Sequence, residues 1–131
     1  MKRNSEEKTL TRAEMEIMNI LWNSEDAMST HSIIENYPDP KPAYSTIATF
    51  LKILTKKGFV NYRKAEAGNK TFYFYPLLTR QSYTSQFMQE TKSTLFGNSA
   101  KAMLHFFAQN EDISDKDIEE ILNMIRNNGR S

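Results

Sequence analysis

The sequence predicts a mainly α-helical chain that contains one small β-hairpin. Three observations lead to this fold class. Apolar residues recur at helical spacing through most of the chain. One aromatic-rich stretch, residues 59–75, has the composition of two strands and a turn. Glycine, proline and capping residues stand where the helical patterns begin or end. We therefore expect three helices, then the hairpin, then further helices.

The first helix is predicted to begin at Thr11. Thr11 and Glu14 have the spacing of a capping box, in which each side chain binds the backbone N–H of the other residue. Apolar residues then follow at helical spacing up to Leu21, and the helix should end near Asn23. We expect Met15, Met18 and Trp22 to pack in the core rather than to hold a ligand.

Caps and prolines bound the next two helices. Ser29 can cap a short second helix that runs through Tyr37, because Pro38 disfavours helix in the residue before it. The third helix should cover residues 43–57, which follow Pro42 and contain neither glycine nor proline. Gly58 supplies the left-handed residue that commonly follows a helix end.

The third helix is predicted to have two opposite faces. At about 100° per residue counted from Ser45, four apolar residues fall between about 140° and 240°. They are Ile47, Phe50, Leu51 and Leu54. Four polar residues fall between about −20° and +40°. They are Ser45, Thr49, Lys52 and Lys56. One face should therefore lie in the core, while the other presents hydroxyl groups and lysines.

The rest of the chain reads as a hairpin followed by helices. Two β-favouring runs, residues 59–64 and 70–75, flank a turn at Gly68-Asn69. Later helices should start at Thr79, at Asn98 or Ser99, and at Ser114. The apolar stripes of these helices need a partner surface, and we expect a second copy of the chain to supply it. The stripes consist of Tyr83, Phe87, Leu95, Met103, Leu104, Phe107, Ile118, Ile121, Leu122 and Ile125.

Length and composition limit the organisation of the chain. A chain of 131 residues can bury one core with a helical extension, but not two domains with separate cores. We place the division after residue 78, with a folded domain at 1–78 and a helical dimerisation region at 79–131. No apolar run is long enough to span a membrane, and the N-terminus lacks the apolar segment of a signal peptide. We expect a cytoplasmic protein.

Several kinds of chemistry are excluded by missing residues. The chain has no cysteine, so it has no disulfide, thiolate metal site or cysteine nucleophile. His31 and His105 lie far apart, and neither has a second histidine at metal-ligand spacing. No glycine-flanked serine and no phosphate-binding loop is present. We therefore expect no enzyme, no metal and no cofactor.

Basic residues are concentrated in the middle of the chain. Residues 41–70 carry seven basic and one acidic side chain, whereas residues 1–40 and 111–131 have net charges of −4 and −3. Three helices followed by a hairpin is the order of a winged helix-turn-helix. In this fold the third helix enters the DNA major groove and the hairpin lies on the flanking backbone. Order and charge together predict binding to double-stranded DNA.

The candidate DNA contacts follow from this placement. Short hydroxyl side chains let the helix approach closely, and lysines reach phosphates or guanine acceptors. The candidates are Tyr44, Ser45, Thr49, Lys52 and Lys56 on the third helix, and Arg63, Lys64 and Lys70 on the hairpin. The alternative is a winged helix that serves as a protein-interaction module, with its basic face unused or bound to an acidic partner. The salt dependence of duplex binding separates the two.

Several motifs resemble the penicillinase-repressor family (BlaI/MecI/CopY type). They are LTRAEMEIM at residues 10–18 with Trp22, AYSTIAT at 43–49, LTKKG at 54–58, and the hairpin end FYP at 74–76. The likeness continues more weakly to about residue 125. It implies a homodimeric transcriptional repressor whose N-terminal winged helix binds a palindromic operator and whose C-terminal helices join the subunits. It places Ser45, Thr46, Thr49 and Lys52 on the recognition helix and Lys70 beside the hairpin turn.

The same resemblance bears on how repression ends. The copper-responsive branch of the family has a cysteine-rich C-terminal metal hook, which this chain lacks. In the antibiotic-responsive branch, cleavage of an Asn-Phe bond in the C-terminal part inactivates the repressor. The matching residues here are His105 and Phe106, which makes them the candidate cleavage site for a membrane receptor protease. The alternative is that residues 102–107 are simply a core helix.

Overall fold

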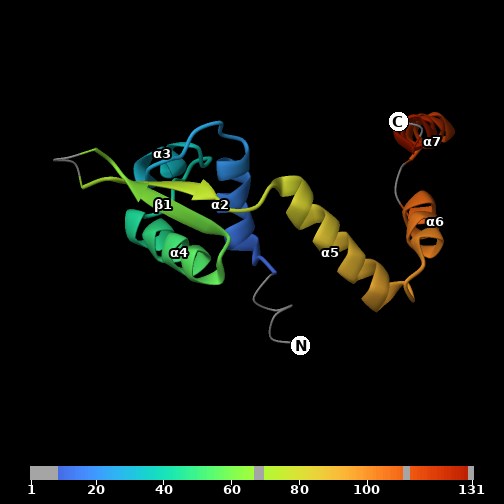
Figure 1. Ribbon diagram of the computed structural model, residues 1–131, viewed down its shortest axis with the longest axis horizontal. Helices are drawn as coiled ribbons and strands as arrows, with labels where there is room; N and C mark the ends of the chain where they lie inside the picture. The colour runs from blue at the N-terminus through green and yellow to red at the C-terminus, as the bar shows by residue number, and fades with distance from the viewer. Residues whose placement is uncertain (1–8, 67–69, 111–112, 130–131) are drawn as a thin grey trace. The chain divides into compact units, whose positions relative to one another are not determined.

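The computed structural model describes residues 9–66, 70–110 and 113–129. Its elements follow the order α2 (Arg12–Trp22), α3 (Thr30–Glu35), α4 (Tyr44–Lys57), β1 (Val60–Lys64), β2 (Phe72–Pro76), α5 (Arg80–Leu95), α6 (Ala100–Asn110) and α7 (Asp115–Gly129) (Figure 1). This order confirms the predicted fold class, three helices with a hairpin and then further helices. The chain divides into two compact units, Met1–Phe87 and Met88–Ser131.

Helix α2 has the predicted capping box. The Glu14 N–H donates to Thr11 Oγ1 over 3.2 Å, and the Thr11 N–H donates to Glu14 Oε1 over 2.9 Å. The helix ends at Trp22 with Asn23 as its C-cap. Its face with Ile17 and Leu21 is buried. Local capping therefore sets the start of α2, and the apolar stripe sets its orientation.

Helices α3 and α4 begin and end close to the predicted residues. Ser29 caps α3 by accepting the Ser32 N–H over 3.2 Å. This helix ends at Glu35 rather than at Tyr37, because the C-cap Asn36 already leaves the helical conformation, with φ −88° and ψ 0°. Helix α4 ends at Lys57, and Gly58 follows in the left-handed conformation with φ +88°.

Strands β1 and β2 form the predicted antiparallel hairpin, which we call the wing. Val60 pairs with Pro76, Tyr62 with Phe74, and Lys64 with Phe72. A short bridge adds Met28, which lies in the loop between α2 and α3 and exchanges two backbone hydrogen bonds with Phe74, of 2.9 and 2.8 Å. The turn predicted at Gly68-Asn69 lies outside the described residues.

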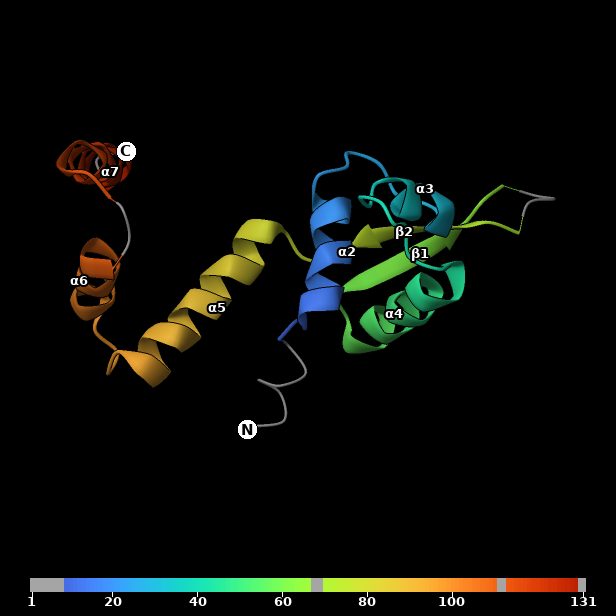
Figure 2. The same cartoon turned by 180° about the vertical axis from the view of Figure 1, so that it is seen from behind.

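One core lies between the helices and the base of the wing. Helix α4 runs alongside β1 and α2 packs near β2 (Figures 1 and 2). The fully buried side chains come from α2, α3, α4 and β1: Ile17, Met18, Leu21, Ile33, Leu51, Leu54 and Val60. Met15 and Trp22 pack against this cluster, as predicted. The N-terminal unit therefore holds α4 and the wing on a common core.

The first residues of α5 belong to the N-terminal unit. Tyr83 is buried, and its hydroxyl accepts the Leu10 N–H over 3.0 Å. The Trp22 and Phe59 rings lie 6.0 and 5.9 Å from the Tyr83 ring. These contacts extend the compact unit to Phe87, beyond the division that we placed after residue 78. The functional division at that residue stays a prediction.

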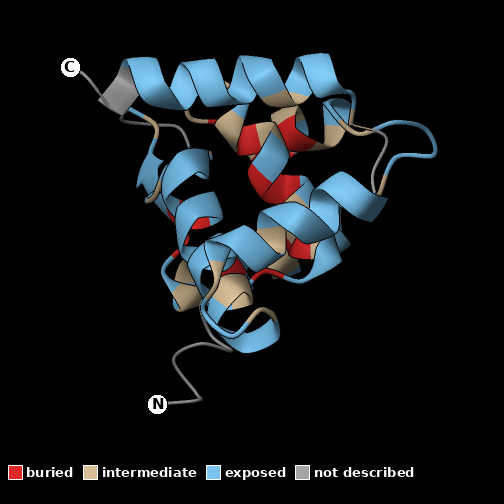
Figure 3. Cartoon of the chain, turned by 90° about the vertical axis from the view of Figure 1, so that its right-hand side faces the viewer, coloured by how far each residue is buried: buried red, intermediate tan, exposed pale blue. Residues whose placement is uncertain are grey.

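The second unit consists of the rest of α5 with α6 and α7. Ser99 caps α6 and Ser114 caps α7, through N–H donors of Ala102 (3.0 Å) and Asp117 (3.1 Å). The buried residues of the described chain, red in Figure 3, lie between Leu10 and Tyr83, and no residue of α6 is buried. Within the described ranges, none of the helices has both the length and the apolar character needed to span a membrane.

Candidate nucleic-acid interface

Helix α4 has the two opposite faces that its sequence predicts. Ile47, Leu51 and Leu54 are buried against the core. The polar face is exposed throughout: Ser45, Thr46, Thr49, Lys52 and Lys56. The burial pattern is thus confirmed, whereas the part of this face in DNA contact stays a prediction.

The hydroxyl group of Thr49 has a partner inside the helix. Thr49 Oγ1 donates to the Ser45 carbonyl oxygen over 2.8 Å. In this rotamer the hydroxyl hydrogen is already used, so the oxygen lone pairs and the methyl group remain available. Thr49 is therefore better suited to accept a hydrogen bond or to touch a thymine methyl group than to donate.

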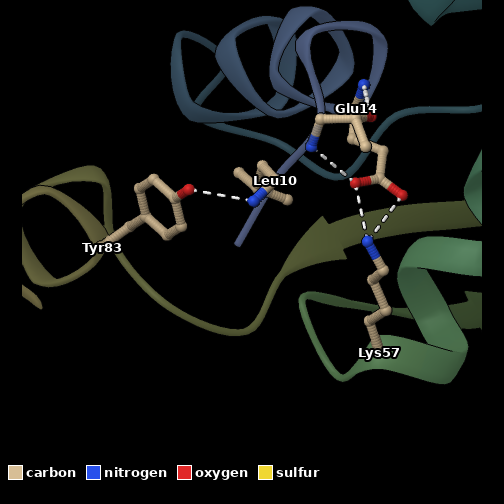
Figure 4. A network of polar contacts seen from close by, with 5 residues as sticks. Leu10, Glu14, Lys57 and Tyr83 are labelled. Atoms are coloured by element: carbon tan, nitrogen blue, oxygen red, sulfur yellow. Dashed lines mark hydrogen bonds and ion pairs between the residues drawn. The ribbon is translucent and has the colours of Figure 1, made fainter. Parts of the chain in front are cut away.

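The two lysines that end α4 have different surroundings. Lys56 is exposed. Lys57 instead donates to Glu14 Oε1 and Oε2 over 2.9 and 3.0 Å (Figure 4). Glu14 is only 3% exposed, and the Lys57 side chain is 23% exposed. Lys57 therefore joins α4 to the start of α2 and does not belong to the exposed basic face.

The charge state of Glu14 follows from this network. Burial alone would raise the pKa of Glu14. The hydrogen bond from the Thr11 N–H and the nearby Lys57 ammonium outweigh burial, and the pKa lies below its ordinary value of 4.5. The carboxylate therefore stays ionised, and the ion pair that positions α4 persists at neutral pH.

The basic residues of the wing lie on both of its faces. Arg63 pairs with Tyr73, and Lys64 pairs with Phe72. Because neighbouring residues of a strand point to opposite sides, Arg63 and Lys64 lie on opposite faces. Both are exposed, as is Lys70, which precedes β2. A nucleic-acid strand running along one face of the wing would thus meet one of the two strand residues, not both.

A cleft of about 400 Å³ lies between the starts of α3 and α4 and the wing. Tyr44 and Lys70 both line this cleft, so the structure brings together two residues that the sequence predicted separately. His31 also lines it, and its ring lies 4.9 Å from the Tyr44 ring. Sequence reasoning had considered His31 only as a metal ligand. The described residues contain no group of three or more acidic or histidine side chains that could hold a metal ion.

The candidate cleavage site lies in the middle of α6. His105 and Phe106 are both exposed in the single chain. The Phe106 ring lies 5.7 Å from the Phe96 ring and 6.0 Å from the Phe107 ring. Since no residue of α6 is buried, packing within one chain does not explain the apolar side chains of residues 102–107.

A helix with one buried face and one basic face, followed by a hairpin on the same core, defines a winged helix-turn-helix protein. Residues 10–127 match the penicillinase repressor family. The chain therefore belongs to that family, as its motifs predicted. It is a DNA-binding transcriptional repressor of the BlaI/MecI type and not an enzyme.

Curated relatives agree with this assignment over most of their length. The chain is 30% identical to the methicillin resistance regulatory protein MecI of Staphylococcus aureus strain N315, over 88% of this chain and 92% of that protein. It is 26% identical to a penicillinase repressor of Staphylococcus aureus, over 88% and 90% of the two chains. A penicillinase repressor of Bacillus licheniformis is 22% identical, over 88% of each chain.

Proposed function

We propose that this repressor binds a palindromic operator as a homodimer, with α4 of each subunit in the major groove and the wing on the flanking backbone. The observation that carries this proposal is the exposed polar face of α4, which lies opposite its buried stripe. A helix held in this way can present its polar face to a groove while its apolar stripe stays in the core. A repressor working on the chromosome of a bacterial cell acts in the cytoplasm.

The contacts divide into two groups. Ser45, Thr46 and Thr49 lie near the start of α4 and are short, which suits contact with base edges. The remaining candidates have reach or charge for backbone phosphates, although the lysines of α4 can also reach guanine. They are Tyr44, Lys52, Lys56, Arg63, Lys64 and Lys70. The base contacts would determine which operator sequence is preferred, and the phosphate contacts would supply most of the affinity for DNA.

The homodimer follows from apolar side chains that one chain leaves exposed. Beyond the N-terminal unit they include Leu95, Leu104, Phe106, Phe107, Ile121, Leu122, Met124 and Ile125. So many exposed apolar residues on consecutive helices are typical of an interface. A twofold dimer would present its recognition helices about one DNA turn apart, or a multiple of that, which matches a palindromic operator.

Substitution of the α4 lysines tests the DNA contact. K52A and K56A should each weaken binding of the full-length protein to its operator, identified by genomic footprinting. Each should also shallow the salt dependence of log K by about one unit, because one fewer phosphate is neutralised. Stability should barely change, since both side chains are exposed.

Lys101, an exposed lysine of α6, supplies the matched control. K101A should leave both affinity and salt slope unchanged. If neither K52A nor K56A changes affinity or slope relative to K101A, α4 is not the recognition helix.

For release, we propose that a membrane receptor protease cuts between His105 and Phe106 and so separates the two half-sites. Two DNA-binding units linked in a dimer benefit from a high effective concentration, which cleaved subunits lose. The test is to expose cells to a cell-wall antibiotic, follow the protein by immunoblot and map any new N-terminus. Derepression while the chain stays full-length would refute cleavage.

A further inference from the structure

The cleft between α3, α4 and the wing is lined by three exposed polar side chains. They are those of His31, Tyr44 and Lys70. Tyr44 is 51% exposed, and the other two are exposed as well. Ser29, in contrast, already caps α3. Three exposed polar side chains around one cleft can bind an external ligand.

The chemistry of the cleft suits an anion. Lys70 is a cation, the Tyr44 hydroxyl is a donor, and an imidazole becomes a cation with two donors when it is protonated. Among the described residues, no aspartate or glutamate lines the cleft. A singly charged phosphodiester accepts hydrogen bonds from all three groups. A neutral ligand would leave the charge of Lys70 unmatched.

The position of the cleft identifies which phosphodiester. Tyr44 opens the recognition helix and is followed directly by Ser45 on its exposed face. Lys70 belongs to the wing and precedes β2. A DNA strand that passes from the groove occupied by α4 to the wing therefore crosses the cleft. No other ligand has to be invoked to place an anion there.

We propose that this cleft holds one backbone phosphate of the operator and that His31 is a further DNA contact whose protonation strengthens binding. The proposal rests on the DNA-binding mode proposed above. The Tyr44 ring lies 4.9 Å from the imidazole and is tilted by 43°, and both side chains line the cleft. Because phosphate favours the charged imidazole, DNA binding is accompanied by proton uptake and becomes tighter as the pH falls.

Other charged and titratable groups surround His31 on each neighbouring element. Tyr44 faces it from α4, and Lys70 faces it from the wing. Glu35 lies one turn further along α3, while Lys64 and Glu66 lie at the outer part of the wing. Of these groups, Tyr44 and Lys70 line the cleft. Histidine is the side chain whose charge ordinarily changes near neutral pH, so a pH effect that H31A abolishes reports His31.

The test compares full-length wild-type protein and His31 variants on a duplex that the wild type has selected from a random-sequence pool. Affinity is measured by fluorescence anisotropy at several salt concentrations, at about pH 6 and about pH 8. Wild-type binding should be about three- to tenfold tighter at the lower pH. Its salt slope should also be steeper there, because protonated His31 adds one positive charge to the DNA interface.

The variants isolate the imidazole. H31A should bind at both pH values as weakly as the wild type does at the higher one, and H31K should stay tight at both. The control is H105N, which removes the other histidine of the chain and should keep the whole pH difference. Because His31 is exposed, its replacement should not disturb folding, and the melting temperatures of the variants check this.

A pH difference that persists in H31A, or a wild-type affinity that is equal at the two pH values, would overturn the proposal while leaving the DNA-binding mode intact. If the wild type selected no duplex at any pH, the proposed function itself would fail, and the inference with it.

Discussion

Glu14 shows how a single side chain can have two structural duties. Its carboxylate closes the capping box of α2 and also binds Lys57 at the end of α4. A nearly buried carboxylate is costly unless it is fully hydrogen-bonded, and here both oxygens have partners. The start of α2 and the end of the recognition helix are therefore held by one residue.

Replacement of Lys57 should be far more harmful than replacement of its neighbour. K57M leaves the Glu14 carboxylate without its cationic partner, and we expect the free energy of unfolding to fall by about 2 kcal/mol at neutral pH. K56M, which changes an exposed lysine of the same helix, should stay within about 0.5 kcal/mol of wild type. Urea denaturation measures both. Equal effects would mean that the ion pair contributes nothing.

The pH dependence of stability should report the same pair. The pKa of Glu14 is lowered on folding, so this group stabilises the protein above the unfolded value of 4.5. That contribution is lost as the pH falls through the lowered folded value. K57M should therefore differ from wild type at neutral pH and converge with it in acid. A difference that stays constant with pH would assign the loss to packing of the lysine stem.

At the scale of the element, Gly58 sets the exit from the recognition helix. Its φ of +88° lies in the left-handed region, and a Cβ added there would meet no atom within 4 Å. Any cost of G58A is thus conformational, and we expect about 1–2 kcal/mol of destabilisation. G58N should cost less, because asparagine tolerates this conformation better. Thermal unfolding tests both, and an unchanged G58A would show that the turn can rearrange.

The elements were predictable because their boundaries are local. The capping box of Thr11, the Ser29 cap and the glycine after α4 are each written in residues within about one turn of one another. The two faces of α4 followed from helical periodicity in the same way. The end of α3 was misplaced, because Asn36 ends that helix before the proline does. The second strand, predicted at residues 70–75, is Phe72–Pro76.

The parts of the site that depend on distant contacts were not predictable. Helical periodicity places Lys56 but not Lys57 on the polar face of α4, but it does not reveal the partner of Lys57, a carboxylate 43 positions earlier. The cleft likewise needs α3, α4 and the wing to be packed before His31 and Lys70 can share it. Composition indicated a basic region, and tertiary packing decides which basic residues are available.

For the whole molecule, the central prediction is that α7 helps to hold two chains together. Ile121 and Ile125 lie one turn apart, and Ile125 is 58% exposed. The double substitution I121D/I125D should convert the dimer to a monomer at micromolar concentration, as measured by sedimentation equilibrium. Operator affinity should fall by orders of magnitude, because the two half-sites are no longer linked.

A charge change elsewhere on α7 provides the control for this prediction. K116A alters an exposed residue at the start of the helix and should leave the dimer intact. Circular dichroism should show that both proteins keep their helices. The dimer would be refuted if the wild type sedimented as a monomer at micromolar concentration and still bound the full operator at full strength.

The backbone bridge between Met28 and Phe74 also predicts how the N-terminal unit opens. It attaches the loop between α2 and α3 to the central residue of β2 through two hydrogen bonds. The base of the wing cannot separate from the helices without breaking both. In native-state hydrogen exchange, the amides of Met28 and Phe74 should therefore exchange together, with the same opening free energy as the core of α2. The outer part of the wing, which lacks this third strand segment, should exchange earlier and independently.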